Sequence, residues 1–177
     1  MAFAYYLYFM VYSVIGWLYE VFLEYFVFGN GFVNRGVLFG PYCPVYGVGT
    51  LAFIFCVYPL LRNKDKKTKL LLLPVIFLLC MGIATLIELI TSYILEALIG
   101  SWPWQTYAEY KYNFQARIAL STSIRFGLGG CLFLYLIQPW LEKLVKKIGD
   151  KKVKIIASII FALFAIDFIT TIIMTFA

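Results

Sequence analysis

The stretch that decides the fold lies at residues 32–49 and reads FVNRGVLFGPYCPVYGVG, between two strongly apolar segments. Pro41 and Pro44 each remove a backbone hydrogen-bond donor, and the four glycines of the stretch allow backbone angles that other residues resist. One regular helix is therefore excluded. Irregular backbone in or beside a bilayer survives only where protein or trapped water satisfies its polar groups. We expect neighbouring helices to cover this broken segment, or the segment to line a cavity.

The composition is that of a membrane protein. Of 177 residues, 63% are apolar and only 14% are charged, and the mean hydropathy is +0.89. This leaves too little polar surface to enclose a soluble core. We predict an all-α integral membrane protein with about five transmembrane helices and one Pro/Gly-broken or re-entrant segment, forming a single transmembrane domain over residues 1–177. Tyrosines and tryptophans near the expected span ends are interpreted as anchors at the headgroup level.

The apolar runs give the expected spans and their direction. The predicted spans are residues 4–28, 45–61, 70–99, 114–140 and 155–177. The lysine-rich stretches 62–69 and 141–154 are expected to be loops on the same, cytoplasmic side. The chain is then a multi-pass protein of the bacterial cytoplasmic membrane, with its N-terminus inside and its C-terminus outside. The broken segment and the Trp-rich connection 100–113 fall on the outer side.

Ionisable side chains occur inside these spans. Each costs about 2.5–3.5 kcal/mol on insertion scales and normally faces a partner or water. Counted at about 1.5 Å per residue from the cytoplasmic ends, Asp167 lies near the middle of the bilayer and Arg35 enters from the outer loop. The other charged residues of the spans fall in the outer half, and they are Glu20, Glu24, Glu88, Glu96, Arg117 and Arg125.

Two spans carry charges with a matching spacing. Polar residues recur at every fourth position from residue 88 to 96 and again from residue 117 to 125, so each set occupies one helical face. Facing residues of antiparallel helices have a constant index sum. That sum pairs Glu96 with Arg117, Ser92 with Ser121, and Glu88 with Arg125.

Two interpretations of these charges stay open. In the first interpretation, the pairs fix helix register, which is a known use of buried polar groups. Alternatively, acids that outnumber the arginines line a vestibule, where a surplus carboxylate binds a proton or a cation. Asp167 has the same two interpretations. In the structural interpretation, Asp167 accepts hydrogen bonds from a tyrosine or caps a neighbouring backbone. In the functional interpretation, it relays protons.

Several chemistries are not favoured. The four cysteines show no Cys-x-x-Cys spacing and the chain has no histidine, so we expect neither a metal site nor a cofactor. No Gly-x-x-x-x-Gly-Lys-Ser or Gly-x-x-x-x-Gly-Lys-Thr motif is present, so ATP binding by a P-loop would need a separate nucleotide-binding subunit. The net charge of +6 is explained by topology and anionic headgroups rather than by nucleic acid.

The broken segment also carries a family likeness. Asn-Arg-Gly at 34–36, Gly-Pro-Tyr-Cys-Pro at 40–44 and Tyr-Gly at 46–47 resemble the CmpB-type ABC-transporter type IV family of bacterial integral membrane proteins. The likeness covers nearly the whole chain and implies a permease-like role. Two positions depart from the family pattern. Trp102-Pro103-Trp104 stands where the family tends to carry Trp-Asp-Tyr, and Ala116 stands where it tends to carry glycine before the arginine.

The leading hypothesis is a small polytopic membrane protein with a permease-like transport role. Its site would be a charged cavity in the outer half of the bilayer, between the broken segment and the paired charges. The candidate substrate- or ion-binding residues are Glu20, Arg35, Tyr42, Glu88, Arg117, Arg125 and Asp167. Expected partners are the lipid bilayer and either further copies of the chain or a separate nucleotide-binding subunit.

Two alternatives come from other classes of protein. One is an intramembrane enzyme that acts on a lipid or isoprenoid headgroup, with a carboxylate or Cys43 as base or nucleophile. The lack of histidine and of any recognisable catalytic motif disfavours it, and no residue is assigned a catalytic role. The other is an accessory subunit of a membrane complex, which predicts that the polar residues of the spans are fully paired inside the fold.

Overall fold

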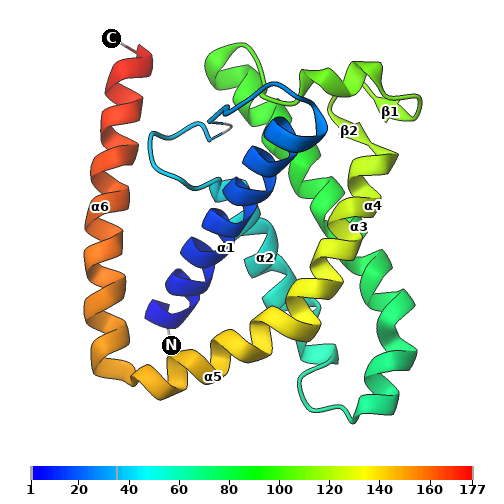
Figure 1. The fold of residues 1–177 in the computed structure, drawn as a ribbon, viewed down its shortest axis with the longest axis vertical. Coiled ribbons are helices and arrows are strands. Elements are labelled where there is room, and N and C mark those ends of the chain that lie inside the picture. The colour runs from blue at the N-terminus through cyan, green and yellow to red at the C-terminus, as the bar shows by residue number, and fades with distance from the viewer. Residues whose placement is uncertain (1, 35, 177) are drawn as a thin grey trace. The chain divides into compact units, whose positions relative to one another are not determined.

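The computed structural model describes residues 2–34 and 36–176 and is almost entirely helical (Figure 1). Within this part of the chain, the helices long and apolar enough to cross a membrane are Ala2–Val27, Lys66–Ile99, Leu120–Ile148 and Asp150–Thr175, and Pro44–Leu60 is a shorter apolar helix. The predicted all-α membrane fold is confirmed. By its contacts the chain divides into two compact units, residues 1–48 with 140–177 and residues 49–139.

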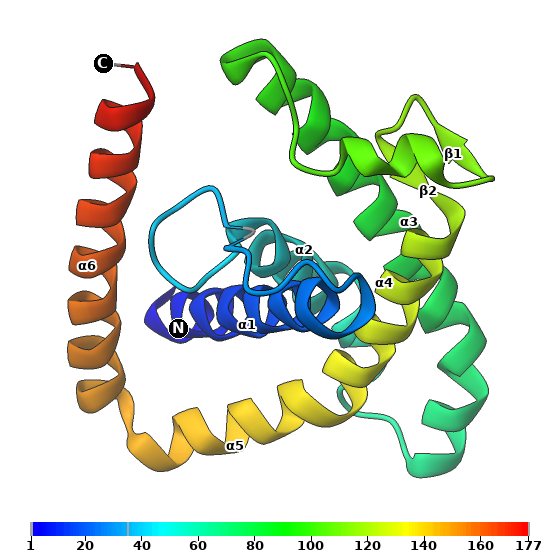
Figure 2. The same ribbon diagram turned by 45° about the horizontal axis from the view of Figure 1, so that its top comes forward.

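The first unit is built on the two terminal helices. Helix α1 (Ala2–Phe22) continues into a π-helical turn, η1 (Leu23–Val27), and α6 (Asp150–Phe176) ends the chain. Leu7 of α1 and Val153 and Ala157 of α6 form a buried apolar cluster near the N-terminus of both helices. Figure 2 shows α1 and α6 from a second direction.

Helix α2 (Pro44–Cys56) begins at Pro44, because a proline in the first helical turn loses no intrahelical hydrogen bond. Its first turns approach α1 closely. A Cβ atom on Gly16 would lie 2.2 Å from Cγ of Tyr46, and one on Gly47 would lie 2.6 Å from the backbone oxygen of Phe9. Both glycines are therefore needed for this close helix contact.

The second unit is built on α3 (Lys66–Ile99) and α4 (Leu120–Leu132), with the later turns of α2 and the short η2 (Tyr58–Leu60). Asp65 caps the N-terminus of α3, and Gly100 ends the helix with a φ of 74°. Gly127 of α4 lies against Phe77 of α3, since a Cβ atom there would lie 2.7 Å from the Phe77 ring. Small residues thus allow α4 to pack along α3.

The start of the fourth span was predicted wrongly. Residues 113–119 form a small antiparallel hairpin of β1 (Asn113–Phe114) and β2 (Ile118–Ala119), and α4 starts only at Leu120. Gln115 and Ala116 make the turn with φ values of 53° and 55°. Neither residue is glycine, so the sequence carried no turn signal at this place. The connection before it contains a short 3₁₀ helix, η3 (Gln105–Glu109).

The end of that span and the loop after it also differ from the prediction. A π-helical turn, η4 (Phe133–Ile137), precedes Pro139, and the N–H of Gln138 donates to the Phe133 oxygen. The wider turn lets the helix continue through the proline. The lysine-rich stretch is therefore not a loop but helix α5 (Gln138–Ile148), which Gly149 (φ 84°) separates from α6.

Candidate functional site

Asp167 of α6 holds the broken segment. Its carboxylate accepts hydrogen bonds from the backbone N–H of Phe39 at 3.1 Å and of Gly40 at 2.8 Å, and from the Tyr42 hydroxyl. Thr171, one turn further along α6, donates at 3.4 Å. The interpretation that Asp167 bonds a tyrosine and caps a neighbouring backbone is confirmed. Among the described residues, its hydrogen-bond donors are all uncharged groups.

Helix α1 satisfies further polar groups of the broken segment. The N–H of Cys43 donates to the backbone oxygen of Ser13 at 2.9 Å. The indole of Trp17 donates to the Asn34 side chain at 2.8 Å, and the same amide oxygen accepts the N–H of Gly36 at 3.2 Å. The expectation that neighbouring helices cover this irregular backbone is therefore confirmed for these groups.

Glu20 lies near Cys43, which is part of this segment. The hydroxyl of Tyr46 in α2 donates to the Glu20 carboxylate. Burial and, after it, the negative charge of Glu20 raise the pKa of the Cys43 thiol to about 12. The thiolate is the nucleophilic form of cysteine, so a raised pKa makes Cys43 a weak nucleophile. This disfavours the role that the enzyme hypothesis gave it.

The Arg117 side chain is enclosed at the end of the hairpin. Arg117 was predicted to lie on the helix of the fourth span, but it precedes α4. Its guanidinium carbon lies 4.0 Å from the ring centre of Tyr93 and 4.1 Å from that of Trp102. Nη2 of Arg117 lies 2.5 Å from a carboxylate oxygen of Glu96. The predicted Glu96–Arg117 pair is confirmed, with the arginine side chain 8% exposed and the glutamate side chain 44% exposed.

The tryptophans of the connection fix the backbone around this arginine. Trp102 donates to the Ala116 oxygen at 3.0 Å, and Trp104 donates to the Arg117 oxygen at 2.8 Å. Interpretation as headgroup anchors had missed this role. Two tryptophans flank Pro103 shortly before the arginine, but this pattern does not distinguish a contact with the arginine from a headgroup anchor. Within the described chain, the buried Nε of Arg117 has no hydrogen-bond partner.

Other predicted site residues have their own partners. Glu88 of α3 accepts a hydrogen bond from the Tyr107 hydroxyl at 2.7 Å. Arg125 of α4 donates from Nε to the Ser121 oxygen on its own helix at 3.3 Å. The pairing of Glu88 with Arg125 stays a prediction. Arg35 lies outside the described residues.

Helices α3 and α4 also meet through hydroxyl groups. Thr85 Oγ1 donates to Ser123 Oγ at 2.7 Å, and Nη1 of Arg117 donates to Ser92 Oγ at 3.4 Å. The first contact joins α3 to α4, and the second joins α3 to the hairpin that precedes α4. The predicted pairing of Ser92 with Ser121 stays a prediction.

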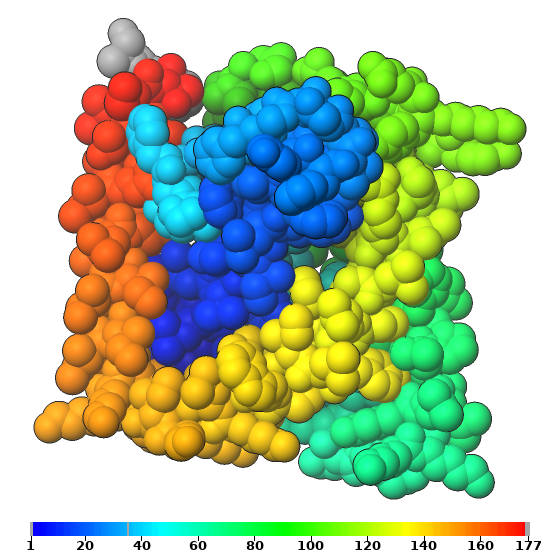
Figure 3. Space-filling view, in the orientation of Figure 1, coloured from blue at the N-terminus to red at the C-terminus, as the bar shows by residue number. Residues whose placement is uncertain are grey.

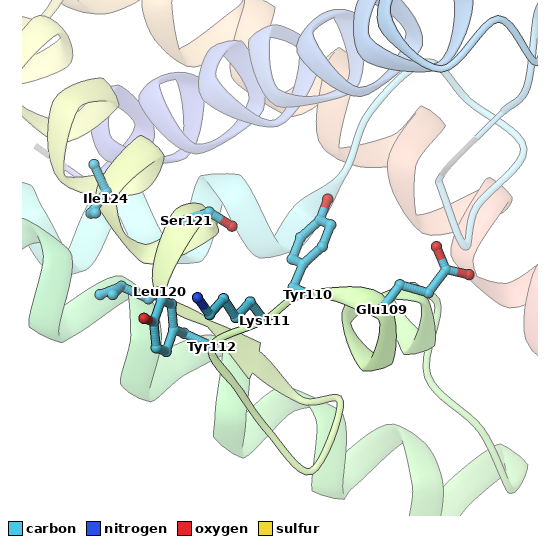
Figure 4. Close-up of a pocket in the computed structure, with 7 residues that line it drawn as sticks. All are labelled: Glu109, Tyr110, Lys111, Tyr112, Leu120, Ser121 and Ile124. Atoms are coloured by element: carbon cyan, nitrogen blue, oxygen red, sulfur yellow. The ribbon is translucent and has the colours of Figure 1, made fainter.

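A small open cleft of about 370 Å³ lies beside the hairpin, and Figure 4 shows its lining. The Lys111 and Tyr110 side chains border it together with Leu120 and Ser121, the first residues of α4. The described residues that line it include none of the predicted site residues. We therefore do not place the candidate site there.

These features define the chain as a helical membrane protein in which ionisable residues of apolar helices hold irregular segments. It belongs to the family described as Putative ABC-transporter type IV, which it matches over residues 7–172. The resemblance to the CmpB-type family is thus confirmed. Comparison with curated proteins and with solved structures gave no match.

Proposed function

We propose that the chain is a permease-like membrane subunit of a transport complex. Membership of an ABC-transporter family supports this role. The proposed substrate- or ion-binding residues are Glu20, Arg35, Tyr42, Glu88, Arg117, Arg125 and Asp167. The observation that carries the proposal is the contact of Asp167 with the backbone N–H groups of the broken segment. Interrupted helices beside a polar group are typical of transporter sites.

The chemistry at Asp167 suits a small cation. Its carboxylate accepts hydrogen bonds from the N–H groups of Phe39 and Gly40 and from the hydroxyls of Tyr42 and Thr171, and such bonds favour the ionised form of a carboxylate. An ionised group in an apolar helix is costly unless it is compensated. A small cation bound at Asp167 would add to that compensation. It would also compete for the oxygens that hold the broken segment, which couples binding to a local change of the backbone.

A separate nucleotide-binding subunit would supply the energy from ATP, because the sequence contains no P-loop motif. Affinity purification from native membranes, solubilised in a lipid-preserving polymer, tests this directly. We expect a P-loop protein to copurify with the chain, together with ATPase activity that unrelated tagged membrane proteins do not bring. Purification of the chain alone, without ATPase activity, from membranes that contain intact complexes of other transporters would contradict the proposal.

The proposed topology is multi-pass, with the N-terminus inside and the C-terminus outside. Lysines of the stretches 62–69 and 141–154 support it through the positive-inside rule. Single cysteines in place of Lys64, Lys147 and Tyr112, in a cysteine-free variant, test it with membrane-impermeant maleimide. Positions 64 and 147 should react only after the cytoplasmic face is opened, and position 112 should react in intact cells. The reverse labelling would exclude this orientation.

An accessory role is a second candidate, and the pairing of Glu96 with Arg117 favours it. That arginine is enclosed by Tyr93 and Trp102 as well, so its charge is used inside the fold. A purely accessory subunit would keep a partner complex assembled and would not itself bind solute. Substitution of Glu88 or Arg125 by Gln would then change how much of the complex assembles. The solute flux per assembled complex would stay the same as in the wild type.

A further inference from the structure

Helix α5 has three different faces. At about 100° per residue, Leu141, Val145 and Ile148 share one side of the helix. Leu141 is buried. Val145 and Ile148 pack against the apolar cluster at the start of α1 and α6, which consists of Leu7, Val153 and Ala157. This side therefore fastens α5 to its own unit.

The second face is apolar and open. Trp140 and Leu144 lie one turn apart and are 60% and 36% exposed. They adjoin the buried side of the helix, so the apolar arc of α5 is wider than the part that the protein covers. An amphipathic tryptophan on such an arc is typical of the boundary between acyl chains and headgroups.

The third face is basic. Lys143, Lys146 and Lys147 are exposed on α5, and Lys151 and Lys152 follow directly at the start of α6. Residues 141–154 contain six lysines against two acids. Figure 3 shows α5 as an uncovered strip of surface, and α5 and α6 meet at a sharp bend in both Figures 1 and 2. Because α6 is an apolar helix long enough to cross a membrane, this bend turns α5 away from the direction of that crossing.

We propose that α5 is an interfacial helix that binds anionic phospholipids. Trp140 and Leu144 insert at the acyl boundary, and the exposed lysines bind the phosphate groups above them. Attraction between a basic surface and anionic headgroups contributes about 1 kcal/mol per lysine, and the apolar side chains hold the helix at the depth where those headgroups lie. The proposal does not depend on a transport role.

The test compares lipid binding by two charge-matched variants of the full-length chain. Native mass spectrometry counts phosphatidylglycerol or phosphatidylcholine bound to protein in detergent. The variant Lys143→Gln, Lys146→Gln, Lys147→Gln should lose affinity for phosphatidylglycerol by on the order of 100-fold. The control Lys64→Gln, Lys66→Gln, Lys67→Gln removes three exposed lysines that have no tryptophan beside them, and it should stay within about threefold of the wild type. Equal loss in both, or no preference of the wild type for the anionic lipid, would overturn the proposal.

Two further variants distinguish a loss of lipid contacts from a loss of the fold. Replacement of the three α5 lysines by arginine keeps the charge and should keep the binding. In bilayers that contain brominated acyl chains, the wild type should lose more tryptophan fluorescence than Trp140→Phe loses. If the two are quenched equally, Trp140 does not reach the acyl chains and an interfacial position for α5 is excluded.

Discussion

The carboxylate of Asp167 and the backbone N–H of Gly40 stand 127 positions apart in the chain and meet at 2.8 Å. Gly40 precedes Pro41, so it lies where the chain cannot continue as a helix. The hydrogen bond therefore ties the irregular end of the broken segment to a regular spanning helix. Such a tie supplies an acceptor for backbone N–H groups that have no intrahelical partner in an irregular segment.

Substitution of Asp167 should loosen this segment. Asp167→Ala leaves the N–H groups of Phe39 and Gly40 without their acceptor, and a hydrogen bond to a charged group contributes about 1.5–3 kcal/mol. We expect the free energy of unfolding to fall by about 2–4 kcal/mol, with faster proteolysis within residues 36–43. Thr171→Ala is the control, because its hydroxyl bonds Asp167 only at 3.4 Å. Equal effects of the two substitutions, measured by unfolding in the same detergent, would contradict the importance of this contact.

Ala116→Gly should stabilise the protein. Ala116 has a φ of 55°, a left-handed conformation that costs a non-glycine residue about 1–2 kcal/mol. Glycine removes that strain but loses more backbone entropy, so we expect a net gain of about 0.5–1 kcal/mol in thermal or denaturant unfolding. Ala119→Gly, at a residue with a φ of −139°, should instead destabilise. Destabilisation by both changes would show that the turn is not strained at Ala116.

A double-mutant cycle should detect the contact between Arg117 and Trp102. Their cation–π interaction predicts a coupling energy of about 0.5–2 kcal/mol between Arg117→Gln and Trp102→Leu. The matched cycle uses Trp104→Leu, because Trp104 bonds the backbone oxygen of residue 117, which any side chain retains. That second cycle should show little coupling. A coupling no larger for Trp102 than for Trp104 would argue against the stacked arrangement.

The N-terminus of α3 should loosen in acid. Hydrogen bonds from the hydroxyl and N–H of Thr68, and then from the N–H of Lys67, hold the pKa of Asp65 below its ordinary value of 3.8. Because the folded-state pKa is lowered, this stabilisation is present above pH 3.8 and is lost as the pH falls through the folded-state value. Amide exchange at Lys67 and Thr68, corrected for its intrinsic pH dependence, should report the change. Asp65→Asn keeps an acceptor that does not titrate, so its corrected exchange rates at these amides should not change with pH. An equal pH response in that variant would rule out Asp65 as the cause.

Much of the architecture could be predicted because the bilayer leaves few alternatives. Long apolar runs had to be helices, and the prolines between them had to interrupt the chain. The same reasoning gave the kinds of group that bond Asp167, as one of two interpretations, and the Glu96–Arg117 pair, since a charge in hydrocarbon must find a compensating group. The Glu96–Arg117 pair follows from the spacing of a few residue types, and its prediction needs no knowledge of packing.

The remaining features depend on local backbone geometry that residue patterns do not encode. The hairpin before α4 turns at Gln115 and Ala116, where neither residue signals a turn. The predicted span 114–140 stops one residue after Pro139, but the π-helical turn before this proline preserves the helix. The enclosure of Arg117 by Tyr93 and Trp102 joins residues from three separate segments. Aromatic residues near a span end are as typical of anchors at the headgroup level as of contacts with an arginine. Composition alone therefore could not assign this contact.

The transport role is tested most directly by the solute content of cells of the source organism that lack this chain. Deletion should change the content of a solute or ion, and the wild-type chain should restore it. Glu109→Gln, which alters an exposed acid of η3, should also restore it, whereas Glu88→Gln and Arg125→Gln should not at equal protein level in the membrane. Full restoration by both of these variants would contradict a permease-like function.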